Sequence, residues 1–343
     1  MNETLAFRNS SQYYHAVLKR IPPRATPAFE AVEMQERVWG KRWGVFNDVG
    51  RIRMIALHRP GDEVSIMTSE KYDPSIDALI DDREQWYFRS EKGPDLALMQ
   101  REHDQLASVL SENGVEIVHV DCGPGNPNAM FVRDDAIIVH GGAIISRMGP
   151  VGEAFGTGRR GEEAYITRAL AGIGMPILHT IHGEGLLEGG SFTFLDETHA
   201  VVGVSLRQNA AGVDQLRCVL RHQGVELIEV PLTGYSMHID GAVMMVDHDK
   251  VLVNVERLPY WFLEKLAELA LEAIPVDYRD DTLAAINSLT IAPGKVIVDI
   301  SAKWTGEMLA AKGLTVIPIS YEECRKHGGG IHCSTLPIIR ERS

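Results

Sequence analysis

The 343-residue chain has few of the features that mark secreted, membrane-spanning or nucleic-acid-binding proteins. Its four cysteines are too few for a disulfide framework in a chain of this length. No apolar run is long enough to span a bilayer, and the polar first 24 residues lack the apolar segment of a secretory signal. We therefore expect a cytoplasmic protein whose cysteines are reduced thiols.

Positive charge is also scarce. The chain has 34 Lys and Arg residues against 47 Asp and Glu, a net charge of −13, and no basic stripe. This balance argues against nucleic acid as a partner and mildly favours cationic ligands through long-range steering. Acidity that serves only solubility is the more common explanation. We expect a small-molecule ligand, with neither nucleic acid nor membrane as a partner.

An amphipathic helix followed by a short β-branched strand recurs five times along the chain. The helices are predicted at residues 96–113, 162–173, 210–223, 260–273 and 302–312. A glycine follows four of the five, as is typical where a helix ends in a left-handed residue, and the apolar period then changes from 3.6 to 2. Hairpins are predicted at 136–145, 192–204 and 242–253, and a strand at 51–58 opens the series.

Units that repeat about every fifty residues indicate a closed array in which each unit buries a face against its neighbours. The chain shows no linker, so we predict one α/β domain over residues 1–343. Residues 1–45 are expected to form an N-terminal extension packed on the ring.

Short polar or glycine-rich segments precede the predicted hairpins and hold the reactive residues. Three of them cover 128–134, 188–191 and 237–241, and a fourth, at 328–333, places three glycines shortly before a cysteine. In a closed ring, equivalent positions converge on the axis. Five side chains would then line one pocket: Asp134, Glu188, His238, Asp240 and Cys333.

This set of side chains has a chemical logic. Several carboxylates near one cysteine and one histidine are costly to bury unless a cation neutralises them. A planar guanidinium suits carboxylates because it forms paired hydrogen bonds, and its central carbon is open to a thiolate. Asp134 and Asp240 would hold the guanidinium while Cys333 attacks it. His238, oriented by Glu188, would protonate the leaving nitrogen and then activate water.

Four motifs occur in order along the chain: Phe-x-Arg-Asp at 131–134, Glu-Gly-Gly at 188–190, Met-His-x-Asp at 237–240 and Gly-Gly-Gly-x-His-Cys at 328–333. With them the chain, from residue 51 to its end, resembles the guanidine-modifying pentein superfamily, in particular the arginine deiminase and amidinotransferase branch. The resemblance implies a five-bladed α/β propeller of pseudosymmetric ββαβ repeats that needs neither metal nor cofactor. It implies Cys333 as nucleophile, His238 as general acid and base with Glu188 as its partner, and Asp134 and Asp240 as guanidinium ligands.

The same resemblance suggests the substrate. Asn128 and Phe131 match positions that contact the substrate, and Arg159 and Arg207 match arginines that hold its carboxylate. We therefore expect L-arginine to be hydrolysed to L-citrulline and ammonia through an S-alkylthiouronium intermediate. Ser191 departs from the family, which often has an aspartate there, and the loop at 149–158 is longer than usual.

Several alternatives stay open. An amidinotransferase would replace water with an amine, and a dimethylarginine hydrolase would act on methylated guanidines, although Asp240 favours an unsubstituted one. A non-catalytic arginine sensor would have no need of the nucleophile. The oligomeric state is not readable, and a homo-oligomer is one option.

Two competing motifs are weaker. The Gly-x-Gly-x-x-Gly at 156–161 lies in a loose loop rather than directly after a strand, which disfavours a dinucleotide site. A glycine run interrupts the cluster of Cys324, His327, His332 and Cys333, which disfavours structural zinc.

Overall fold

A computed structural model of the chain describes residues 3–123, 125–149, 159–234 and 236–342. Five three-stranded sheets repeat one pattern, an antiparallel pair followed by a parallel neighbour. Their strands are β18 (Leu336–Arg340), β1 (Ile52–Leu57) and β5 (Glu116–His119); β6 (Ala136–Val139), β7 (Gly142–Ile145) and β8 (Ile177–Thr180); β9 (Phe192–Phe194), β10 (His199–Val204) and β11 (Glu226–Pro231); β12 (Val243–Asp247), β13 (Lys250–Val253) and β14 (Glu272–Pro275); and β15 (Leu289–Ala292), β16 (Lys295–Asp299) and β17 (Thr315–Ile319).

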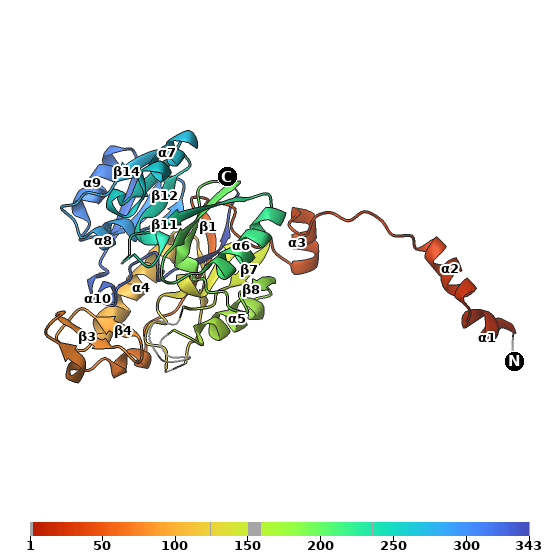
Figure 1. Cartoon of the computed structure of the whole chain (residues 1–343), viewed down its shortest axis with the longest axis horizontal. Helices are drawn as coiled ribbons and strands as arrows, with labels where there is room; N and C mark the ends of the chain where they lie inside the picture. Colours follow the sequence, from red (N-terminus) through yellow and green to blue (C-terminus); the bar gives the residue numbers. More distant parts are fainter. Residues whose placement is uncertain (1–2, 124, 150–158, 235, 343) are drawn as a thin grey trace.

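In each of these sheets one helix connects the two parallel strands, because parallel neighbours need a long crossover. The connecting helices are α4 (Leu96–Glu112), α5 (Glu162–Gly172), α6 (Ala210–His222), α7 (Tyr260–Glu268) and α9 (Lys303–Ala311). The first strand of the ring, β1, pairs antiparallel with the last, β18, so the two ends of the body share one sheet. This mixed α/β fold with five repeated units is the class predicted from the sequence (Figure 1).

Left-handed residues end these helices as the sequence predicts. Gly114, Gly174, Gly224 and Gly313 have φ between 75° and 88°. The unit of β12, β13 and β14 lacks the glycine, and Ala270 takes its place with a φ of 58°. Helix α7 therefore ends at Glu268 and β14 begins at Glu272, so the predicted helix at 260–273 is too long.

Some elements were not predicted. The hairpin of β15 and β16 belongs to the repeat, whereas β2 (Tyr72–Asp73), β3 (Ala78–Asp81) and β4 (Trp86–Phe88) form a small separate sheet. Two short helices, α8 (Thr282–Ile286) and α10 (Glu322–Arg325), lie in the connections that follow β14 and β17. In the described part of the chain, no helix has the length and apolar character needed to cross a membrane.

The N-terminal extension packs on the body only in part. Helices α1 (Glu3–Arg8) and α2 (Ser11–Arg20) lie far from the body, at the end of an extended segment, whereas α3 (Val32–Trp39) lies beside it (Figure 1). Helix α2 has no buried residue, and residues 21–28 are all exposed. The expectation that the whole extension packs on the ring is therefore corrected to its last segment, from about residue 29 onward.

Candidate active site

Three short 3₁₀ turns, each directly before a hairpin, lie next to one another. They are η3 (Val132–Asp135), η4 (Gly189–Ser191) and η5 (Ile239–Gly241), and η4 contacts both of the others. Asp134 lies within η3, while Glu188 and His238 immediately precede η4 and η5. The turns thus bring side chains about fifty residues apart in sequence into one group.

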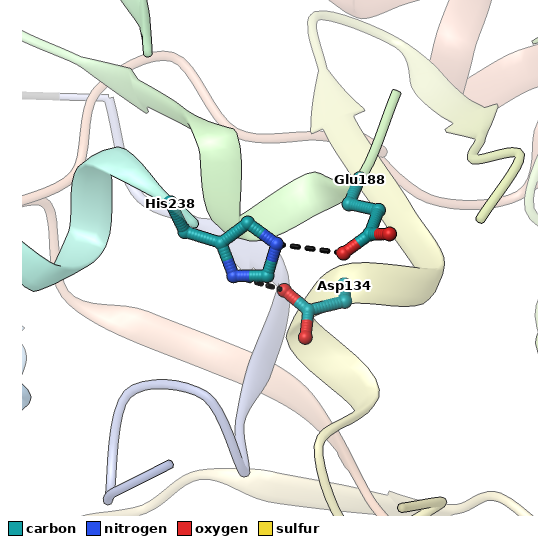
Figure 2. A group of neighbouring side chains, drawn as sticks. All are labelled: Asp134, Glu188 and His238. Carbon is teal, nitrogen blue, oxygen red and sulfur yellow. Dashed lines mark hydrogen bonds and ion pairs between the residues drawn. The ribbon is translucent and has the colours of Figure 1, made fainter. Parts of the chain in front are cut away.

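The imidazole of His238 lies between two carboxylates (Figure 2). Its Nε2 is 2.7 Å from Oε2 of Glu188, and its Nδ1 is 3.4 Å from Oδ1 of Asp134. Burial disfavours the charged ring, but the negative charge of Asp134 and the hydrogen bond to Glu188 outweigh it. Together they raise the pKa of His238 to about 9. The ring is therefore a cation at neutral pH and can donate a proton.

Glu188 is fully buried and remains an anion. Burial alone would raise its pKa, but the guanidinium of Arg207, 3.3 Å away, and the bond to His238 lower the pKa of Glu188 to about 2. The backbone N–H of Gly149 also donates to Oε1 over 2.9 Å. These contacts hold the carboxylate in the one orientation that supports the imidazolium.

The thiol of Cys333 lies on the segment that leads into β18, near the C-terminal end of the chain. It donates to Oδ2 of Asp240 over 3.4 Å, and the same oxygen is 3.0 Å from Nδ1 of His332. Burial, together with the charges of Asp240 and Asp134, raises the pKa of the Cys333 thiol well above its usual range. The resting side chain is therefore a neutral thiol that must be activated before it can attack.

Asn287 is a site residue that the sequence did not indicate. Its Nδ2 donates to Sγ of Cys333 over 3.0 Å, and its Oδ1 accepts from the backbone N–H of Cys333 over 3.1 Å. It follows α8 and precedes the β15–β16 hairpin, which makes it the counterpart of His238 in the unit of β15, β16 and β17. The sequence signal that could have identified Asn287 is its position about fifty residues after His238, which is the spacing of the repeat.

The three glycines before Cys333 pass close to side chains that line the site. A Cβ on Gly328 would overlap the hydroxyl of Tyr87, and one on Gly329 would overlap the ring of Phe131. A Cβ on Gly330 would lie 2.7 Å from Oδ1 of Asn287. The run is therefore needed because the backbone packs directly on the walls of the pocket.

The catalytic candidates open into one cavity of about 610 Å³. It is lined by all nine residues singled out from the sequence: Asn128, Phe131, Asp134, Arg159, Glu188, Arg207, His238, Asp240 and Cys333. Asn128 and Phe131 form its wall beside Tyr87 and His327. The nine residues thus come together, and the substrate contacts of Asn128, Phe131 and Arg207 stay predictions.

Arg159 has an unexpected set of partners. Its guanidinium pairs with Asp134, donates to Oε2 of Glu162 over 2.7 Å, and donates to the carbonyl of Phe131 over 2.8 Å. Its side chain is only 9% exposed. Arg159 was predicted to bind a substrate carboxylate, and Asp134 was predicted to bind a substrate guanidinium. In the structure these two side chains pair with each other.

Beneath Arg159 lies a pair of fully buried acids, Asp135 and Glu162. Burial, with the charge of Glu162, raises the pKa of Asp135 well above its usual range, and burial also raises the pKa of Glu162. The pair therefore retains a proton, and Arg159 balances the remaining negative charge together with that of Asp134.

Ser191, which stands where the family often has an acid, is fully buried. Its hydroxyl accepts a hydrogen bond from Nε2 of Gln208 over 2.6 Å. It thus supports the wall behind the site. Most of the loop at 149–158, including the start of the Gly-x-Gly-x-x-Gly motif, lies outside the described residues.

Asp134, Glu188 and His238 are also a group that could hold a metal ion, since their ligand atoms lie within 4.8 Å of one another. The guanidiniums of Arg159 and Arg207 already pair with two of the three, and both would repel a metal cation. The donor set therefore fits a proton-transfer site better than a metal site. Within the described ranges, Cys324, His327, His332 and Cys333 do not form a metal-holding group.

Comparison with known proteins identifies the family of the chain. The family model for arginine deiminase matches residues 124–258 and 270–340, more than half of the chain. The chain is 29% identical over 336 residues to a 2-nitroimidazole nitrohydrolase of Mycobacterium sp. strain JS330, covering 89% of this chain and 84% of that protein. It is 27% identical over 259 residues to an arginine deiminase of Listeria monocytogenes, covering 63% of this chain and 62% of that enzyme, less than two thirds of its length.

Solved structures share the fold at lower identity. The dimethylarginine dimethylaminohydrolase (DDAH) of Pseudomonas aeruginosa, in complex with citrulline, superposes with a TM-score of 0.66 at 22% identity. The match covers 84% of this chain and all of that one. The amidinotransferase SxtG from Microseira wollei gives a TM-score of 0.65 at 15% identity, over 88% of this chain and 98% of that one.

Proposed function

Since the chain belongs to the arginine deiminase family of the guanidine-modifying pentein superfamily, we propose that it is a hydrolase that uses Cys333 to cleave a bond at a carbon flanked by nitrogens. The observation that carries the proposal is that one cavity is lined both by the hydrogen-bonded pair of His238 and Glu188 and by Cys333. A nucleophile, a proton donor and a carboxylate on the thiol are the groups that this chemistry needs. A reducing compartment such as the cytoplasm suits an enzyme that depends on a free thiol.

With L-arginine as substrate, the thiolate of Cys333 attacks the guanidinium carbon and forms a C–S bond. The departing nitrogen takes the proton of His238 and leaves as ammonia, which yields the S-alkylthiouronium. Neutral His238 then removes a proton from water, the hydroxide attacks the same carbon, and the C–S bond breaks. The new hydroxyl loses its proton to solvent as the carbonyl forms, L-citrulline leaves, the thiolate is restored and His238 is charged again.

The electrostatics support a role for the substrate cation in the first step. The thiol of Cys333 has a raised pKa because it is buried beside Asp240 and Asp134. A guanidinium bound against Asp240 would offset that negative charge and lower the pKa of the thiol, so that its proton passes to solvent before the thiolate attacks. Asn287 would then stabilise the thiolate through its N–H donor.

A second substrate class is favoured by the contact between Arg159 and Asp134. With Arg159 in place, one of the two predicted guanidinium ligands already has a positive partner. A neutral azole with a good anionic leaving group then becomes a candidate, as the name of the nitrohydrolase relative suggests. In a 2-nitroimidazole, Cys333 would displace nitrite from a carbon between two nitrogens, and water would then release the imidazolone.

The proposal is tested by incubating the protein with L-arginine, with and without glycine, with Nω,Nω-dimethylarginine and with 2-nitroimidazole. Citrulline and ammonia from arginine support the deiminase, and nitrite from the azole supports the second class. Ornithine with a guanidino acid would identify a transferase, and dimethylamine would identify a dimethylarginine hydrolase. Cys333→Ala should abolish every activity, while Cys218→Ala, at an exposed cysteine, should retain it. Turnover by Cys333→Ala would refute the mechanism.

The two substrate classes make opposite predictions for Arg159→Gln. If Arg159 binds a substrate carboxylate, the variant should raise KM for L-arginine more than tenfold and leave the decarboxylated analogue agmatine unaffected. If Arg159 neutralises Asp134, the variant should instead slow release of an anionic leaving group and increase the relative kcat/KM for cationic guanidines. Steady-state kinetics on arginine, agmatine and 2-nitroimidazole measures both effects.

A further inference from the structure

The N-terminal arm, defined here as residues 3–28, extends away from the body of the protein and hardly packs on it (Figure 1). Every residue from 21 to 28 is exposed, and no residue of α2 is buried (Figure 1). The rings of Phe7 and Tyr13 meet edge to face at 5.8 Å, so α1 and α2 contact each other rather than the ring of sheets. A ten-residue helix is marginal in water without a surface to pack on.

One face of α2 carries a stripe of apolar side chains that nothing covers. Tyr14 and Leu18 of α2 and Ile21, the residue that caps its end, follow each other at helical spacing and are 63%, 59% and 65% exposed. Phe7 of α1, at 47% exposure, extends the same apolar set. A contiguous apolar surface on a short helix indicates a site of association with another protein.

The segment between α2 and the body is built to hold the arm outward. It contains Pro22, Pro23 and Pro27, which favour an extended, semi-rigid chain of about 25 Å for eight residues. Its far end is fixed on α3, where the carbonyl of Phe29 accepts from Nε2 of Gln35 over 2.9 Å and its ring contacts Trp39. Such a spacer carries α2 beyond the surface of its own chain.

Charge indicates what the arm meets. Residues 1–30 contain four basic residues and two acidic ones, a net charge of +2, while the rest of the chain carries −15. Three of the basic residues, Lys19, Arg20 and Arg24, lie at the end of α2 and in the spacer. The acidic surface of a second copy of this chain is complementary to this arm and is always present at equal concentration.

We propose that the arm docks on a second copy of the chain, so that the protein is a homo-oligomer held together by exchanged arms. In a closed, symmetric assembly each copy both gives and receives an arm, which buries the stripe of Tyr14, Leu18 and Ile21 twice. The inference concerns assembly alone and stands whether or not the proposed reaction is correct.

The test uses the full chain and variants confined to the arm. Tyr14→Glu with Leu18→Glu places two charges on the apolar face, and the matched control Gln12→Glu with Ala16→Glu adds the same charges to the opposite face of α2. Sedimentation equilibrium should give an oligomer for wild type and control, and the mass of one chain for the apolar-face variant. Higher salt should weaken the assembly.

Two results would overturn the proposal: a full chain that is monomeric, or an apolar-face variant that keeps the wild-type mass. If a monomeric full chain also cosediments with phosphatidylserine vesicles and the apolar-face variant does not, the arm is assigned to a membrane surface instead. Crosslinking in a mixture of isotopically light and heavy chains would locate the docking surface, through crosslinks that join Lys19 of one copy to the body of another.

Discussion

At the scale of single residues, His238 already has the charge that a thiolate–imidazolium pair requires, whereas Cys333 does not. Burial and two carboxylates keep Cys333 protonated, while Asp134 and Glu188 keep His238 charged. The productive state, thiolate beside imidazolium, is therefore a minor species in the free protein. Substrate binding or a shift in pH must populate it.

This arrangement predicts the pH dependence of thiol alkylation. Between pH 6 and about 9 the iodoacetamide reaction at Cys333 should accelerate about tenfold per pH unit, since only the thiolate reacts. Near pH 9 it should flatten, because His238 loses its charge there and the pKa of the thiol rises further. Peptide mass spectrometry measures it, with exposed Cys218 as internal reference. A rate independent of pH from 6 to 8 would show a preformed thiolate and contradict the assignment.

At the scale of elements, the 3₁₀ turns before the hairpins depend on glycine to bring Asp134 and His238 together. A Cβ on Gly190 would overlap Oδ1 of Asp134 and lie 2.9 Å from Nδ1 of His238. Gly190→Ala should therefore displace both groups and lower kcat/KM by about 100-fold. Gly172→Ala, at the end of α5 with open space around it, is the control and should keep full activity. Equal activities in the two variants would contradict the packing of η4 on η3 and η5.

The ends of the crossover helices allow a second comparison, this time of stability. Ala270 adopts a left-handed φ of 58° at the position where other units have glycine. Ala270→Gly should therefore raise the free energy of unfolding by up to about 1 kcal/mol. Gly224→Ala, with a φ of 75° and no atom within 4 Å of the new Cβ, should lower it by a similar amount. Urea denaturation measures both, and shifts of the same sign would contradict the strain argument.

At the scale of the whole molecule, the repeat could be read from the sequence because it depends on local signals. Glycines after helices, alternating strands and polar segments before hairpins are all set by neighbouring residues. Asn287 was not predicted as a site residue because the hairpin after it was not recognised. Its segment was therefore not aligned with those of Glu188 and His238. The contacts of Arg159 escaped because they depend on which buried acids lie beside it in three dimensions, which no local pattern reveals.

The catalytic charges also predict how stability varies with pH. The pKa of His238 is about 9 in the folded protein and about 6.5 unfolded, so its contribution is fully present below pH 6.5 and lost as pH rises to 9. That contribution is up to about 3 kcal/mol. The Cys333 thiol, whose pKa is raised, acts in the same direction above pH 8.5. Urea titrations from pH 6 to 9 should show falling stability, with a smaller slope in His238→Gln. A slope unchanged in that variant would contradict the raised pKa.

The central claim is that Cys333 forms a covalent bond to the substrate carbon. The most direct measurement is rapid acid quench during turnover, followed by mass spectrometry of the peptide that contains Cys333. We expect a transient mass increase on that peptide equal to the substrate less its leaving group, which is arginine less ammonia or nitroimidazole less nitrous acid. An unmodified Cys333 throughout steady product formation, together with turnover by Cys333→Ala, would contradict it.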